Sequence, residues 1–385
     1  MTAPRVRSFL ATDSILGQFG LGGPAARLAA VLARDFGPAA VFARGESGAG
    51  LPPGTVRLHR KAPWRRLLHG TRLHRLQMRP EARERIGFDR AAARVLPPCD
   101  LAVVENSTGL GTLRRAKAAG ARTLLLYYNR EFRGFRADLE EERRRWGGPA
   151  PFITQALVER CEAEAAEADL VTAFSGAVLD GLERTGVPRS RLRRAHYAVD
   201  AERFRPAPRR DGEFTVALVG WLAFWKGYPY LVEAFRDARI PGSRLLLHGG
   251  TDVRYHHGLV ARLKGDADVS VVRGPVEETY ARASVVVLPS VSDAYGIAAL
   301  EGMACGLPVI VSDRCGAAED VREGENGFVV PARDTGALRD RLVRLHADPA
   351  LRARMGEAAR RTALTRPWDL FERDFVAILR EAIGS

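Results

Sequence analysis

Two carboxylates flank a stretch of chain whose residue types suit a phosphorylated ligand. In SDAYGIAALEGMACGLPVIVSD, residues 292–313, Asp293 and Glu301 lie on either side of a glycine at position 296. The apolar residues before this stretch predict a buried strand, and those up to Gly306 predict a helix. A helix start offers unpaired backbone N–H groups and the positive end of the helix dipole, and both attract phosphate. The acids would accept hydrogen bonds from sugar hydroxyls, which predicts a ligand that is part phosphate and part polyol.

A simpler interpretation explains the same acids without a ligand. Asp293 would cap the N-terminus of the helix. Glu301, roughly two turns further along, would be a solvated residue on the outer face of that helix. The spacing alone leaves both interpretations open.

The elements that position these acids alternate between apolar strands and helices along the whole chain, which predicts an α/β fold with parallel sheets. In the first half, strands are expected at 6–13, 39–44, 55–59, 100–107, 122–129 and 170–175. A stretch rich in proline and arginine at 203–213 interrupts the pattern and predicts a linker. In the second half, strands are expected at 214–220, 243–250, 268–274, 284–290, 308–313 and 327–330.

This alternation predicts two doubly wound, Rossmann-like domains that face a central cleft. In such folds the ligand binds at the carboxyl ends of the strands. The first domain is expected to span residues 1–205 and the second residues 206–366. The last helical pattern, in residues 367–385, predicts a C-terminal helix that could cross back to the first domain.

Composition excludes several classes of protein. The 385-residue chain is 46% hydrophobic and 27% charged, which is typical of globular proteins. It has no apolar run of membrane-spanning length, and MTAPRVRSFLATD lacks the apolar core of a signal peptide, so we expect a cytoplasmic protein. The cysteines have no metal-ligand spacing, His256-His257 has no spaced third ligand, and Asp266-Ala267-Asp268 fits a solvated turn. No metal site is therefore expected.

Several ordered motifs give the chain a resemblance to a known family. Asp293-x7-Glu301 and the following GMACGLPVIVSDRCGAAEDV resemble the E-x7-E signature of retaining glycosyltransferases with the GT-B fold, group 1 (family four). The stretch VALVGWLAFWKGYPYLVEAF resembles the opening of that family's donor domain, and FSGAVLDGLERTGVPRSRLRRAHYAVDAERFRP resembles the segment that closes its first domain. GLGGPAARLAAVLA and GENGFVVPARD agree in order and spacing, so the resemblance covers nearly the whole chain.

The resemblance implies roles for the matched residues around the two acids. Glu301 would bind the ribose hydroxyls of a nucleotide, and Asp293 would contact the donor sugar. Lys226 would compensate the charge of the departing diphosphate, which is a large electrostatic contribution to catalysis. The residues implied to hold the diphosphate through their backbone N–H groups are Tyr295, Gly296, Ile297 and Ala298.

Further positions in the glycine-rich turns match the family less specifically. Gly22 and Gly23 would let the first helix approach the phosphates, and Gly220 ends the strand that precedes Lys226. Gly274 and Val276, within VRGPV, fall where the family contacts the nucleotide base. Ordinary turns explain these residues too, and an ordinary surface lysine would explain Lys226.

Three positions depart from the family pattern. Trp221 stands where the family usually has an arginine after the strand glycine, so a phosphate-binding cation is missing or comes from another loop. The first acid is Asp293 rather than glutamate, which shortens the side chain by one methylene. Asn129, or its neighbour Tyr128, occupies the place of a frequent histidine; Asn129 could hydrogen-bond a donor hydroxyl.

The net charge of +13 is concentrated in one block of the chain. Residues 57–90 carry eleven lysines and arginines against three acids, a local charge of +8. Because Trp64 and several leucines lie among the arginines, the block could rest on the anionic inner face of a membrane and meet a lipid-linked acceptor. An arginine-rich composition without a partner explains the charge equally well. Nucleic acid is not expected, because few aromatic residues alternate with the charges.

The sequence thus predicts a retaining glycosyltransferase that needs no metal or other cofactor. It would move a hexose-type sugar from a nucleoside diphosphate, with UDP the first choice, to a hydroxyl of a small-molecule, glycan or lipid-linked acceptor. Two alternatives remain on the same fold. One is a protein that binds nucleotide or glycan without catalysis, which Trp221 and Asn129 would fit, and the other is a sugar-nucleotide epimerase.

Overall fold

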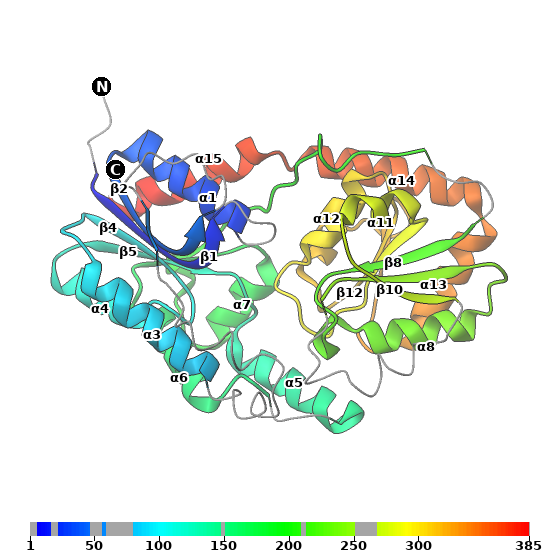
Figure 1. The fold of residues 1–385 in the computed structure, drawn as a ribbon, viewed down its shortest axis with the longest axis horizontal. Coiled ribbons are helices and arrows are strands. Elements are labelled where there is room, and N and C mark those ends of the chain that lie inside the picture. The colour runs from blue at the N-terminus through cyan, green and yellow to red at the C-terminus, as the bar shows by residue number, and fades with distance from the viewer. Residues whose placement is uncertain are drawn as a thin grey trace.

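The computed structural model describes residues 6–16, 22–46, 56–58, 80–147, 151–208, 213–250 and 268–384. In this part of the chain the strands form two fully parallel sheets, one in the N-terminal half (up to residue 208) and one in the C-terminal half (from residue 213). Figure 1 shows the two sheets side by side, each covered by helices. The predicted α/β class is therefore confirmed.

The N-terminal sheet has the strand order β3-β2-β1-β4-β5-β6-β7. Its strands are β1 (Ser8–Leu16), β2 (Ala39–Glu46), β3 (Val56–Leu58), β4 (Leu101–Glu105), β5 (Arg122–Tyr127), β6 (Leu170–Ala173) and β7 (Leu192–Arg194). Its helices are α1 (Gly22–Val31), α3 (Pro80–Val95), α4 (Leu110–Ala118), α5 (Phe132–Trp146), α6 (Gln155–Glu167) and α7 (Gly176–Arg184). Strand β7 was not predicted, because a short strand with two arginines has no apolar run.

The C-terminal sheet has the order β10-β9-β8-β11-β12-β13. Its strands are β8 (Thr215–Val219), β9 (Arg244–His248), β10 (Val269–Val272), β11 (Val285–Leu288), β12 (Val309–Ser312) and β13 (Gly327–Val330). Its helices are α8 (Tyr228–Ala238), α11 (Val276–Arg282), α12 (Ile297–Ala304), α13 (Thr335–Ala347) and α14 (Pro349–Leu364), and a last helix, α15 (Trp368–Ala382), follows them in the chain.

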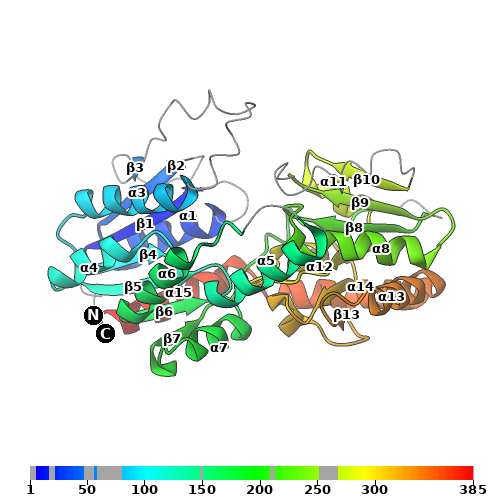
Figure 2. The same ribbon diagram turned by 90° about the horizontal axis from the view of Figure 1, so that it is seen from below.

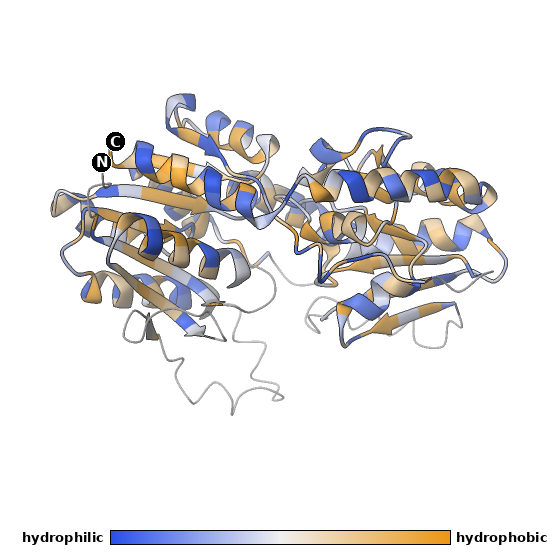
Figure 3. Ribbon diagram, turned by 90° about the horizontal axis from the view of Figure 1, so that it is seen from above, coloured by the Kyte–Doolittle hydropathy of each residue, from blue (hydrophilic) through white to orange (hydrophobic). Residues whose placement is uncertain are grey.

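The hydrophobic pattern explains why these segments form central strands. Every residue of β4, β8, β11 and β12 is buried, as expected for parallel strands with helices on both faces. Figure 3 shows the same pattern, with apolar residues in the strands and polar residues along the outer helix faces. In each sheet the strand order reverses next to the first strand, between β1 and β4 and between β8 and β11, and ligands bind at such points in doubly wound folds.

The C-terminal helix α15 belongs by packing to the N-terminal half. It contacts α1 and β5, and Figure 1 shows it beside α1, at the far side of the molecule from α13. Its Phe371 and Phe375 are fully buried and join an aromatic cluster with Phe174. The domain boundaries expected at 205 and 366 stay a prediction; the first lies between the last strand of one sheet and the first strand of the other.

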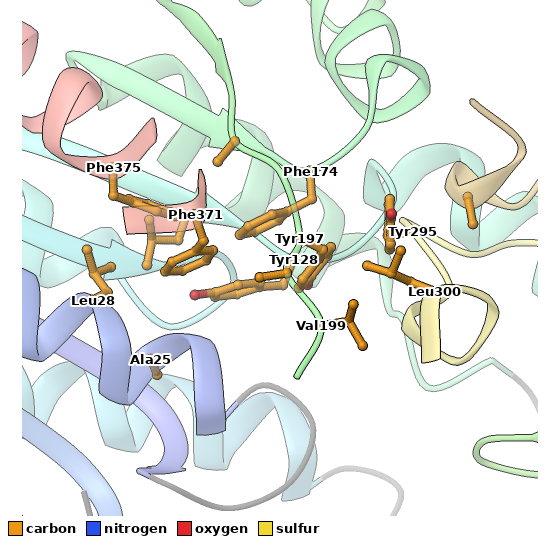
Figure 4. Close-up of a cluster of buried hydrophobic side chains, with 14 of the residues drawn as sticks. Ala25, Leu28, Tyr128, Phe174, Tyr197, Val199, Tyr295, Leu300, Phe371 and Phe375 are labelled. Carbon is orange, nitrogen blue, oxygen red and sulfur yellow. The ribbon is translucent and has the colours of Figure 1, made fainter. Parts of the chain in front are cut away.

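One hydrophobic cluster connects the two halves. Phe174 stacks on Tyr197 with ring centroids 4.0 Å apart. The ring centroids of Tyr197 and Tyr295, just before α12, are 4.9 Å apart. Figure 4 shows this row of rings, from Phe375 on α15 across to Tyr295 in the C-terminal half, where Leu300 lies beside it. The halves are therefore packed against one another rather than joined by a linker alone.

Two segments of the sequence analysis lie outside the described residues. Most of the basic block, residues 59–79, is not described, so its membrane contact stays a prediction. Residues 256–257 and 266–267 also lie outside the described residues, so the expectation that they bind no metal stays a prediction. Within the described ranges, no helix combines the length and the apolarity that a membrane crossing needs.

The docking of α15 gives a stability prediction. We expect Phe375→Ala to lower the free energy of unfolding by about 3–5 kcal/mol, because it leaves a cavity in a fully buried aromatic cluster. The control is Leu364→Ala, at a residue that is 51% exposed. It should change the free energy of unfolding by less than about 0.5 kcal/mol. Urea unfolding of both variants checks this; equal stabilities would mean that α15 does not pack on the N-terminal half.

Candidate active site

A cavity of about 370 Å³ opens between the two halves, at the carboxyl ends of β5, β8 and β11. The N-terminal half contributes the segment after β5, and the C-terminal half contributes the loops that follow β8 and β11. The structure brings nine of the predicted residues to this cavity: Asn129, Gly220, Lys226, Asp293, Tyr295, Gly296, Ile297, Ala298 and Glu301.

The backbone at the start of α12 is fixed by its neighbours. Gly296 is the N-cap residue and has a φ of +90°, a left-handed conformation that glycine adopts at little cost. A Cβ there would lie 2.5 Å from the sulfur of Cys315, so a side chain does not fit. The N-cap makes no side-chain hydrogen bond to the first turn of the helix. Ile297 and Ala298, the first residues of α12, therefore line the cavity without a side-chain cap.

The loop before α12 pairs with the segment after β12. The Asp293 N–H donates to the Arg314 carbonyl at 3.1 Å, and the Gly316 N–H donates to the Asp293 carbonyl at 3.2 Å. The Ala317 N–H then donates to the Tyr295 carbonyl at 2.6 Å. These bonds hold the loop in one conformation before any ligand arrives, which is the condition for electrostatic preorganisation.

Lys226 ends a short 3-10 turn, Phe224–Lys226, and faces Asp293. Its Nζ lies 2.6 Å from Asp293 Oδ2, and both side chains are largely buried. Gly227 follows in a left-handed conformation, with φ +73°, and a Cβ there would overlap the carbonyl oxygen of Pro289. The Lys226 ammonium group is thus held at a defined place beside the loop that follows β11.

Helix α5 of the N-terminal half supports the turn that carries Lys226. Trp225 packs edge-on against Phe135 of α5, with ring centroids 5.8 Å apart. Further along α5, the buried Glu142 carboxylate accepts a hydrogen bond from the Tyr230 hydroxyl at 2.9 Å and one from the Arg333 Nε at 2.7 Å. Figure 2 shows α5 reaching from the N-terminal half to the helices of the other half.

Glu301 lies one turn inside α12, and it is only 4% exposed. Burial raises the pKa of its carboxyl to about 7, although a hydrogen bond from the Tyr280 hydroxyl at 2.7 Å opposes the rise. The solvated role considered for Glu301 is therefore wrong, and so is the capping role of Asp293, because the N-cap is Gly296. Glu301 is also nearer the helix start than the expected two turns, because α12 begins at Ile297 rather than beside Asp293.

Five predicted residues are not among the described residues that line the cavity. Trp221 follows the lining residue Gly220 and is 50% exposed. Gly22 and Gly23 begin α1, Gly274 lies between β10 and α11, and Val276 is the first residue of α11. Their roles toward a ligand stay predictions.

Sequence reasoning missed two residues of the site. Tyr280 orients Glu301 from α11, and no motif marks it, because the contact forms between two helices. Arg130 lines the cavity directly after Asn129, and its position at the end of a predicted strand was a usable signal. Within the described residues, no three histidine, cysteine, aspartate or glutamate side chains gather as a metal site would require.

The fold is that of known glycosyltransferases. Sucrose-phosphate synthase from Thermosynechococcus elongatus superposes with a TM-score of 0.75 at 21% identity, covering 99% of this chain and 100% of that chain. HepE of Anabaena, solved in complex with UDP and glucose, gives a TM-score of 0.69 at 17% identity and covers 98% and 100%. The predicted GT-B fold is confirmed.

The family match lies in the half of the chain that carries Lys226, Asp293 and Glu301. Residues 200–362 match the family model for glycosyl transferases group 1. The putative glycosyltransferase EpsD of Bacillus subtilis is 31% identical over 202 residues, 48% of this chain and 52% of that protein. D-inositol 3-phosphate glycosyltransferase of Mycobacterium tuberculosis is 32% identical over 222 residues, 52% of this chain and 45% of that protein. The matched stretch thus spans about half the length of these relatives.

The buried Glu301 carboxyl predicts a pH effect on stability. Because its pKa is raised to about 7 from 4.5, the folded state binds a proton more tightly than the unfolded state, so this residue's contribution to stability falls as pH rises from 4.5 to 7. Glutamine cannot ionise. The free energy of unfolding of Glu301→Gln, relative to that of the native protein, should therefore be higher at pH 8 than at pH 5, by on the order of 1–3 kcal/mol.

Urea unfolding at both pH values measures this difference. The control is Glu325→Gln at an exposed residue, which should change the free energy of unfolding by less than about 0.5 kcal/mol at either pH. A difference for Glu301→Gln that is also independent of pH would show that the carboxyl ionises as it does in water.

Proposed function

We propose that this protein is a retaining glycosyltransferase. It moves a sugar from a nucleoside diphosphate to a hydroxyl of a small-molecule, glycan or lipid-linked acceptor. One observation carries the proposal: an uncapped helix start, a lysine and a buried carboxylate face the same cavity between two Rossmann-like halves. The group 1 family match of residues 200–362 supports it.

The donor binds on the C-terminal half. Its diphosphate lies against the N–H groups at the start of α12, where unpaired donors and the helix dipole favour negative charge. The ribose hydroxyls donate to the Glu301 carboxylate, one oxygen of which already accepts from Tyr280. UDP is the proposed nucleotide and a hexose the proposed sugar, because HepE was solved with UDP-glucose.

Transfer breaks the bond between the anomeric carbon and the diphosphate oxygen, whose electron pair leaves with the diphosphate. The acceptor oxygen bonds to that carbon from the same face, and the departing diphosphate takes the proton of the acceptor hydroxyl. Negative charge grows on the diphosphate in the transition state, and Lys226 and the α12 start stabilise it. When the donor binds, Asp293 exchanges part of its ion pair with Lys226 for hydrogen bonds to sugar hydroxyls.

Removal of the two charged groups tests the site. We expect Lys226→Ala to lower kcat about 10²–10³-fold, because it removes a charge that acts mainly in the transition state. Glu301→Ala should mainly weaken donor binding. Lys117→Ala, at a surface lysine that pairs with Asp169, is the control and should keep native turnover. Donor hydrolysis and transfer by purified protein measure this, and native rates in both site variants would refute the assignment.

The proposed reaction needs no metal, because Lys226 and the helix start supply the positive charge. We expect turnover to be unchanged within a factor of two after treatment with EDTA. A loss of activity that Mg²⁺ or Mn²⁺ restores would contradict this part of the proposal.

A second candidate is a binding protein without turnover. Trp221 and Asn129, which replace ionisable residues of the family pattern, favour it. UDP-dependent thermal stabilisation without any hydrolysis or transfer would support this alternative.

A further inference from the structure

Arg130 lines the cavity from the N-terminal half, whereas the proposed donor-binding loops belong to the C-terminal half. It follows Asn129, which comes after β5, and precedes α5, so it belongs to the N-terminal half. Its side chain is 10% exposed. Arg130 and Lys226 are the two positively charged residues among the described residues that line the cavity.

The charges at the cavity wall are too evenly balanced for a diphosphate. Lys226 and Arg130 face Asp293 and Glu301, and Lys226 is already paired with Asp293. Trp221, which has no charge, is half exposed next to the cavity residue Gly220. A nucleoside diphosphate brings further negative charge, so a cation besides Lys226 is needed near the phosphates.

The guanidinium of Arg130 has an unmade hydrogen bond. Its buried Nε has no hydrogen-bond partner among the described residues, and the nearest carboxylate oxygen, Glu131 Oε2, is 3.7 Å away. A second acid, Asp138, lies about two turns into α5. Burial raises the pKa of Asp138, and Arg130, Arg314 and Arg333 oppose that rise. An unsatisfied buried donor costs free energy, so this guanidinium gains from a new hydrogen-bond acceptor at the cavity.

We propose that Arg130 binds the diphosphate of the donor and so supplies, from the N-terminal half, the cation that Trp221 does not provide. The assignment rests on the proposed function. Guanidinium suits this role, because its planar fork can give two hydrogen bonds to one phosphate.

This placement links donor binding to the approach of the two halves. The α12 start and Lys226 hold the diphosphate from the C-terminal half, while Arg130 contacts it from the other. The diphosphate then bridges the cavity, and the wall after β5 is drawn toward the sugar. A nucleoside monophosphate lacks the second phosphate and gains less from Arg130.

The test is calorimetric binding of UDP and UMP to the native protein and to Arg130→Gln. We expect UDP affinity to fall about 10- to 100-fold in the variant, as for loss of a hydrogen bond between charged groups, and UMP affinity to change less than threefold. Arg130→Lys keeps the charge but not the planar fork. Its UDP affinity should lie between those of the native protein and Arg130→Gln. Arg133→Gln, at an exposed arginine on α5, is the matched control and should bind UDP as the native protein does.

The outcomes separate the two proposals. Native UDP affinity in Arg130→Gln would overturn the inference and leave the proposed function intact. An equal loss for UDP and UMP would also overturn it, because it would mean a structural role for Arg130. If the native protein binds neither UDP nor GDP, the proposed function fails, and the inference fails with it. Thermal unfolding of the variants shows that each is folded.

Discussion

The site depends on one backbone constraint, the left-handed conformation of Gly296 against the sulfur of Cys315. It turns the chain from the loop after β11 into α12 without a capping side chain. The first N–H groups of the helix are therefore left for a ligand, and hydrogen bonds to residues 314–317 hold them in place. A larger residue at position 296 would displace the loop that carries Asp293, and with it the partner of Lys226.

The same loop is also tied to the other half of the molecule. The Ser175 hydroxyl at the start of α7 donates to the Ala294 carbonyl at 2.7 Å, and Tyr295 packs against Tyr197. On the other side of the cavity, α5 reaches over to Trp225 and Arg333. Each wall of the cavity is thus positioned partly by the opposite half, so a change in the spacing of the halves would alter the site.

The sequence predicted what local patterns determine. Continuous apolar runs gave both parallel sheets, and the spacing of Asp293 and Glu301 around a glycine gave the helix start that lines the cavity. It could not show that Glu301 is buried beneath Tyr280, because that contact is between separate elements. It also missed the crossing of α5, whose charged composition hides the few residues, such as Phe135 and Glu142, that contact the other half. Contacts of this kind depend on tertiary packing, which no short motif encodes.

The central claim is that a pyrophosphate binds at the amide end of α12, and a crystal structure of the protein with UDP tests it most directly. The account predicts phosphate oxygens within hydrogen-bond distance of the N–H groups around Ile297 and Ala298, with the ribose hydroxyls on the Glu301 carboxylate. A nucleotide bound elsewhere, or one that leaves Glu301 in contact with Tyr280 alone, would contradict it.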